Sequence, residues 1–175
     1  GPDAAGGVGL LASGPGQIAG RNRMWRKMMI DDLKSNDLTA AVQILLLAGS
    51  APLQWQKSGA TRDDADRWID EQSKTRLATT DAGDLLYAIE SSSDYDPSAQ
   101  LERITAPLLA INSADDFINP PELGILEAGM KRVKRGRYVL IPTSDATHGH
   151  STHTWAAVWE RELRDFLAHN ALSVP

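Results

Sequence analysis

Residues 107–150 read PLLAINSADDFINPPELGILEAGMKRVKRGRYVLIPTSDATHGH, and this stretch decides the fold. The short apolar run LLAIN (108–112) is typical of a buried strand, and YVLI (138–141) predicts a second one. Between them, two prolines open an amphipathic segment that predicts a helix over residues 120–133, with Gly136 as its stop. Strand, helix and strand in alternation predict a parallel sheet of the α/β class.

Outside this stretch the pattern continues in both directions. VGLLAS (8–13) predicts a further buried strand, and Thr154 is expected to cap a last helix whose apolar residues share one face. Residues 20–95 carry no strand pattern. They predict four helices, over residues 21–34 and 38–48, after Thr61 and after Asp81.

Composition narrows the function classes. The 175 residues include no cysteine and carry a formal net charge of −5, with 42% hydrophobic residues. The absence of cysteine excludes disulfides and thiolate metal sites. An acidic chain without clustered positive charge argues against a nucleic-acid partner, and no apolar run is long enough to span a membrane. The segment GVGLLA (7–12) matches a dinucleotide motif only weakly, because it overlaps the predicted strand, so we expect no cofactor.

The two central strands end in loops rich in ionisable side chains. SADDFINP (113–120) follows the first strand and PTSDATHGHS (142–151) follows the second. Functional residues of parallel sheets collect at the carboxyl ends of the strands. An acid on one strand and a histidine on the next is the order found in α/β-hydrolases, whose triad runs Ser, Asp, His along the chain. The histidine takes the serine proton, and the carboxylate orients the imidazole.

Three segments, residues 17–35, 111–124 and 147–153, resemble the homoserine O-acetyltransferase-like branch of the α/β-hydrolases. The resemblance implies that this chain is the C-terminal half of an α/β-hydrolase parallel sheet with an inserted helical lid. It assigns residues 1–19 to a core strand, residues 20–95 to the lid and residues 96–175 to the rest of the core.

The resemblance also selects the site residues. The acid of this branch precedes a proline by four positions, which selects Asp116 (with Pro120) over Asp115. The histidine follows a glycine, which selects His150 as the base. Asp115 is then expected to be a capping or solvated neighbour. The alternative for Asp116 is a plain cap of the helix predicted after it.

The sequence lacks a nucleophile. It has no G-x-S-x-G, and Ser13, Ser50 and Ser113 all lack the flanking glycines. The resemblance therefore implies that an upstream N-terminal segment or a second chain carries the serine, and that the substrate is a small acyl compound or ester. The sequence Gly-His-Ser-Thr (149–152) departs from the acetyltransferase pattern and favours hydrolysis. The alternatives are an O-acyltransferase and a non-catalytic fragment or partner-binding subunit.

Two further patterns have competing interpretations. His148, His150 and His153 match an H-x-H-x-x-H zinc spacing, but the downstream ligands of such sites are lacking, so we expect no metal. A cationic group in the first predicted lid helix could face an acidic substrate or pair with nearby acids. Methionines in the same helix predict lid core or the face of a homodimer. The cationic residues are Arg21, Arg23, Arg26 and Lys27.

Overall fold

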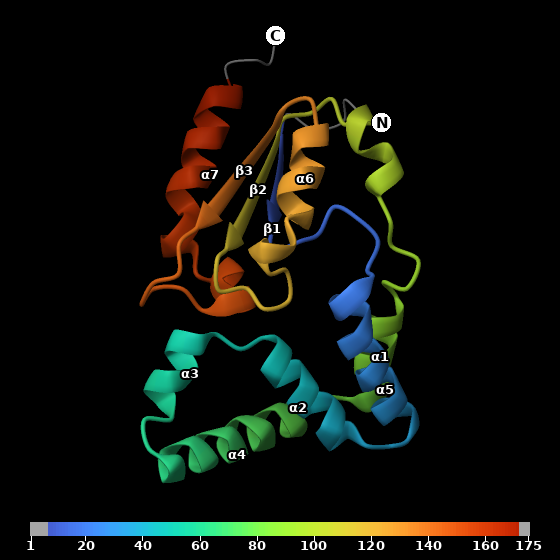
Figure 1. Cartoon of the computed structure of the whole chain (residues 1–175), viewed down its shortest axis with the longest axis vertical. Helices are drawn as coiled ribbons and strands as arrows, with labels where there is room; N and C mark the ends of the chain where they lie inside the picture. The colour runs from blue at the N-terminus through green and yellow to red at the C-terminus, as the bar shows by residue number, and fades with distance from the viewer. Residues whose placement is uncertain (1–6, 172–175) are drawn as a thin grey trace. The chain divides into compact units, whose positions relative to one another are not determined.

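The computed structural model describes residues 7–171, which form two units. One unit is discontinuous in sequence and consists of the described residues up to Gln17 and from Asp96 onward. The other is the helical unit, Ile18–Tyr95. Figure 1 traces the elements of both. The discontinuous unit contains β1 (Val8–Leu11), η1 (Ser98–Arg103), β2 (Leu108–Ser113), η2 (Pro121–Leu123), α6 (Ile125–Arg132), β3 (Gly136–Ile141), η3 (Gly149–Thr154) and α7 (Ala156–Ala171).

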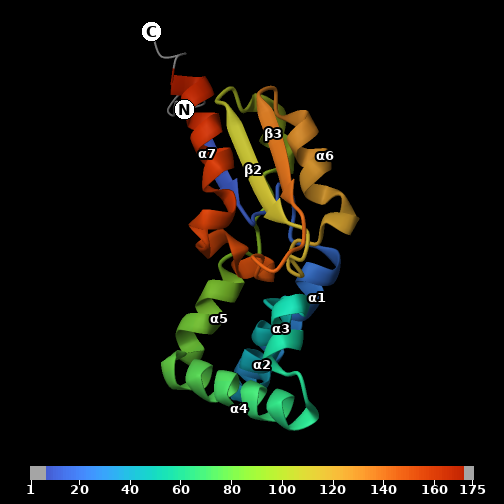
Figure 2. The same cartoon turned by 90° about the vertical axis from the view of Figure 1, so that its left-hand side faces the viewer.

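The sheet of this unit has the order β1-β2-β3 in the described residues, and both pairings are parallel. Side chains alternate between the two faces of a strand. Leu108 and Ala110 of β2 therefore pack with α6, whereas Leu109 and Ile111 pack with Phe166 of α7. The two helices lie on opposite faces of the sheet (Figures 1 and 2). The predicted α/β class with a parallel sheet is confirmed.

β1 lies at the edge of this sheet. Within residues 7–171 it pairs with β2 alone, from Val8 opposite Leu108 to Leu11 opposite Ile111. Both faces of β1 contribute to the core, since Leu10 packs with the α6 cluster and Leu11 with the α7 cluster. The glycine-rich segment forms the strand itself rather than a turn into a helix.

Three predictions about helices in this unit are wrong. The helix expected over residues 120–133 is broken into η2 and α6 by Gly124, whose φ of 64° is a left-handed conformation suited to glycine. Gly136 begins β3 instead of ending the helix. Thr154 does not cap α7, because it belongs to η3 and its hydroxyl donates to the Ser151 carbonyl.

The helical unit has five helices in place of the four expected. Pro52, four residues after the end of the second predicted helix at residue 48, is the first residue of an additional short helix. The predicted caps are present: Thr61 accepts from the Asp64 amide and Asp81 from the Asp84 amide. The helices are α1 (Gly20–Lys34), α2 (Leu38–Ala48), α3 (Pro52–Ser58), α4 (Arg62–Thr79) and α5 (Ala82–Glu90).

The core of the helical unit is built around α1. Trp25, Met29 and Leu33 are buried, as their helical spacing predicts, whereas Met28 is 56% exposed and does not belong to the core. Among the described helices, no single one is long and apolar enough to cross a membrane. The pair α2 and α3 together meets that requirement but is bent by 114°.

Candidate active site

Asp116 lies in the turn that follows β2. Its side chain is fully buried. Oδ1 accepts hydrogen bonds from the backbone amides of Ile118 (2.8 Å) and Asn119 (3.0 Å). These two bonds close the loop locally and fix the plane of the carboxylate. The capping alternative is thus partly met, but the amides belong to the loop and not to a helix.

His150 faces this carboxylate from the next strand-end loop. It is the second residue of η3 and follows Gly149, which has a φ of 58°. Its Nδ1 lies 3.0 Å from Asp116 Oδ2 and 3.2 Å from Oδ1. A carboxylate only accepts, so Nδ1 carries the proton and Nε2 is left as the basic nitrogen. The structure brings the two predicted site residues together.

The charge of the Asp116 carboxylate affects the pKa of Tyr138 in β3. Burial raises the pKa of the Tyr138 phenol, and the carboxylates of Glu127 and Asp116 raise it further. A neighbouring negative charge disfavours a second one. The phenol therefore stays protonated and neutral beside the acid.

Two asparagines tie the acid loop to the sheet. The Asn119 side-chain amide donates to the Ala12 carbonyl (2.9 Å), immediately after β1, and that of Asn112 donates to the Asn119 carbonyl (2.8 Å). Ala12 has a φ of 51°, which is unusual for a residue with a Cβ. The end of β1 is thus held against the loop that carries Asp116. Sequence reasoning missed both asparagines, because their partners lie on other segments.

Asp115 has a different position from the one expected. It is buried, and its Oδ2 accepts from the Thr147 hydroxyl (2.8 Å) and the Gly149 amide (3.1 Å), while the Ser113 hydroxyl donates to Oδ1. The prediction of a capping or solvated residue is wrong. Successive side chains after a buried strand point in different directions, and this one turns into the histidine loop.

The other histidines of the loop do not converge on His150 as metal ligands would. His153 donates from Nδ1 to the His150 carbonyl (2.6 Å), and the two rings meet edge to face. His148 is stacked on Trp155 with centroids 3.9 Å apart. In residues 7–171, no three histidine or carboxylate side chains lie close enough together to hold a metal ion.

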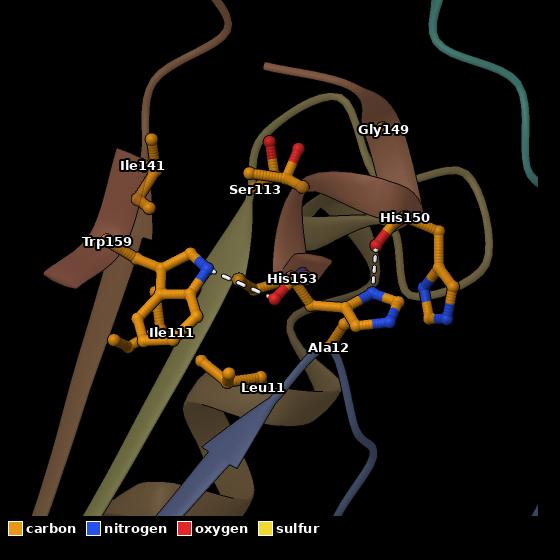
Figure 3. Close-up of a pocket in the computed structure, with 11 residues that line it drawn as sticks. Leu11, Ala12, Ile111, Ser113, Ile141, Gly149, His150, His153 and Trp159 are labelled. Carbon is orange, nitrogen blue, oxygen red and sulfur yellow. Dashed lines mark hydrogen bonds between the residues drawn. The ribbon is translucent and has the colours of Figure 1, made fainter. Parts of the chain in front are cut away.

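A small apolar pocket lies under the histidine loop (Figure 3). Its volume of about 10 Å³ is close to the volume needed to hold one water molecule. The Trp159 indole closes one side and donates to the His153 carbonyl (3.1 Å). The pocket is lined at the strand ends by Leu11, Ala12, Ile111, Ser113 and Ile141. This packing supports the loop from the α7 side.

The cationic group of α1 is engaged within the helical unit. Lys27 pairs with Asp31 (2.5 Å), as one interpretation predicted. Arg26 is half-buried, lies over the Trp25 ring and donates to the Asn22 and Ser92 side chains. Burial lowers the pKa of Arg26, and the charge of Arg23 lowers it further. For Lys27, these contacts favour the pairing interpretation over the substrate one.

No protein-family profile matches the chain, and no curated protein matches it either. Solved structures do match, and they give the class: the fold is that of the α/β-hydrolases. At the identities found, the similarity concerns the fold alone.

Three of the solved structures illustrate the match. Esterase E22 gives a TM-score of 0.79 at 16% identity over 95% of this chain and 55% of its own. Homoserine O-acetyltransferase from Staphylococcus aureus gives 0.74 at 16% identity, with coverages of 92% and 50%. An acetylester hydrolase from Corynebacterium glutamicum gives 0.74 at 12% identity, with coverages of 95% and 55%. This chain thus spans about half the length of the structures it matches.

Proposed function

We propose that this chain is the C-terminal half of a serine hydrolase of the α/β-hydrolase fold, in which Asp116 and His150 are the acid and the base of the triad. The observation that carries the proposal is the 3.0 Å contact between His150 Nδ1 and the buried Asp116 carboxylate at the carboxyl ends of adjacent parallel strands. Esterases among the fold matches support carboxylic esters as the substrate class.

The serine comes from the upstream segment or a second chain. Within residues 7–171, β1 pairs with β2 alone, which supports this assignment because a further parallel strand can pair with the other edge of β1. His150 Nε2 takes the hydroxyl proton while the serine oxygen bonds to the acyl carbon. The proton passes to the departing alcohol, and water then attacks the acyl-enzyme to release the acid.

The helical unit is the proposed lid of this enzyme, and its exposed Met24 and Met28 are the proposed face of a homodimer. A lid that covers an ester site excludes water and shapes the acyl pocket. The substrate in this proposal is a small ester.

Release of free acid from an activated ester tests the proposal. The assembled enzyme, incubated with p-nitrophenyl acetate and no acceptor alcohol, should produce acetate at a rate that saturates with ester.

The match to a homoserine O-acetyltransferase favours acyl transfer as the second candidate. Turnover that requires homoserine would assign the transferase. A lack of turnover under both conditions would favour a non-catalytic, partner-binding chain.

A further inference from the structure

Two adjacent carboxylates hold the histidine loop from different sides. Asp116 contacts the His150 ring, whereas Asp115 contacts the backbone and side chains of the preceding turn. Asp115 is only 9% exposed. A buried carboxylate is costly unless its oxygens are fully hydrogen-bonded, so its partners indicate its purpose.

The partners of Asp115 span the turn that leads into His150. Oδ2 accepts from the Thr147 hydroxyl and the Gly149 amide, at 2.8 and 3.1 Å. Thr147 in turn accepts from the Ser144 amide (3.0 Å), so its hydroxyl connects the start of the turn to Asp115. Gly149 has a φ of 58° and is followed directly by His150. The position of the Gly149 amide therefore fixes the backbone from which the His150 side chain extends.

We propose that Asp115 is a positioning residue, which holds the Thr147–Gly149 turn at the distance where His150 Nδ1 meets Asp116. The inference rests on the proposed function. The contact between Nδ1 and Oδ2 is made across two loops, and a displacement of about 1 Å in such a contact can cost about 100-fold in rate. Three donors converge on Asp115, from Ser113, Thr147 and Gly149, which requires a side chain rich in acceptors.

Substitutions at Asp115 and Thr147 can distinguish a role of Asp115 as a hydrogen-bond acceptor from a role of its negative charge. In Asp115→Asn, the amide oxygen can keep the Thr147 and Gly149 bonds, and the new NH₂ group can donate to the Ser113 oxygen. In Asp115→Ala, all three bonds are lost. Thr147→Val removes the hydrogen bond to Asp115 and the bonds to the Ser144 backbone without changing the shape of the side chain, and Thr147→Ser restores the hydroxyl.

Steady-state ester hydrolysis by the assembled enzyme measures the effect. We expect Asp115→Ala to lower kcat about 100-fold and leave KM within about twofold, and Asp115→Asn to stay within about fivefold of wild type. Thr147→Val should fall about tenfold in kcat, and Thr147→Ser should stay near wild type. A wild-type kcat in folded Asp115→Ala would overturn the inference. Equal losses in Asp115→Asn and Asp115→Ala would also overturn it, because charge and not geometry would then decide.

A second readout does not depend on activity. NMR of the same protein labelled with ¹⁵N reports the Nδ1–H of His150 and the exchange rate of the Gly149 amide proton. Asp115→Ala and Thr147→Val should weaken the Nδ1–H signal, and the Gly149 proton should exchange at least tenfold faster in Asp115→Ala. Unchanged signals in both variants would show the inference to be wrong. If wild type proves inactive on esters, the proposed function fails, but this comparison still decides whether Asp115 positions His150.

Discussion

The two oxygens of Asp116 are not equivalent. Oδ1 accepts hydrogen bonds from the backbone amides of Ile118 and Asn119, and Oδ2 is the oxygen closest to His150 Nδ1. The backbone amides therefore fix which oxygen faces the imidazole. This asymmetry makes the consequence of an amide substitution predictable at atomic detail.

We expect Asp116→Asn to reduce kcat for ester hydrolysis about 10⁴-fold without loss of the fold. The two amides can be satisfied only if the asparagine oxygen occupies the Oδ1 position, which turns the NH₂ group toward His150. Nδ1 must then accept, so the proton moves to Nε2, and the base can no longer take the serine proton. Stopped assays for kcat and ¹⁵N NMR of the imidazole tautomer measure both effects.

Asp165→Asn on the exposed side of α7 is the matched control and should stay within about twofold of wild type. A loss of less than about tenfold in Asp116→Asn would mean that the carboxylate does not orient the base.

Among the individual residues, the sequence selected Asp116 and His150, the proposed acid and base, but not the residues that hold their loops. Strand order and the resemblance selected this pair, and both can be read from the sequence alone. Asp115 and Asn119 act through hydrogen bonds between segments that are distant in the chain, whereas Asn112 bonds the loop that follows its own strand. No local pattern encodes such pairs. The Asp-Asp sequence directly after a buried strand was the available signal, because functional side chains collect at the carboxyl ends of parallel strands.

Among the elements, α1 shows how helical spacing separates buried from exposed methionines. Met29 is completely buried in the helical unit, whereas its neighbour Met28 is 56% exposed. Successive residues on a helix are 100° apart, so only one of the two can face the core. The sequence grouped them together because both are apolar.

Met29→Ala should lower the free energy of unfolding by about 2–5 kcal/mol, since it removes buried apolar atoms and leaves a cavity. At a protein concentration low enough to dissociate the proposed homodimer, Met28→Ala should change the free energy of unfolding by less than about 0.5 kcal/mol. Urea unfolding followed by circular dichroism gives both values. Similar losses in the two variants at that low concentration would contradict the exposed position of Met28, whereas a larger loss in Met28→Ala at high concentration would support the proposed homodimer.

Element types were easier to predict than element boundaries. Each of the three strands and the helical nature of residues 20–95 followed from apolar runs and periodicity. The errors occur at residues that interrupt or flank a helix. Gly124 both ends η2 and precedes α6, and Pro52 begins α3 after α2 has ended at Ala48. Gly136 begins β3, and Thr154 belongs to η3. A breaker residue signals an interruption but not whether the chain resumes a helix after it.

At the scale of the whole molecule, two observations point in the same direction. β1 lies at the edge of the sheet in the described residues, and the chain covers about half of each matched structure. Both are expected if further strands, the nucleophile and the oxyanion hole come from other sequence, as proposed. The proposed activity would then belong to the assembly, so the kinetic tests use the assembled enzyme. The central claim is that His150, and no other histidine of its loop, is the base of that assembly.

The rate of ester hydrolysis by the assembled enzyme, with His150→Ala compared with His148→Ala, tests this claim most directly. Both residues lie in the same loop, but His148 is stacked on Trp155 while His150 contacts Asp116. We predict that His150→Ala lowers kcat by at least about 10³-fold with the fold intact, and that His148→Ala stays within about tenfold of wild type. Equal losses in the two variants, or a His150→Ala enzyme that retains its activity, would contradict the account.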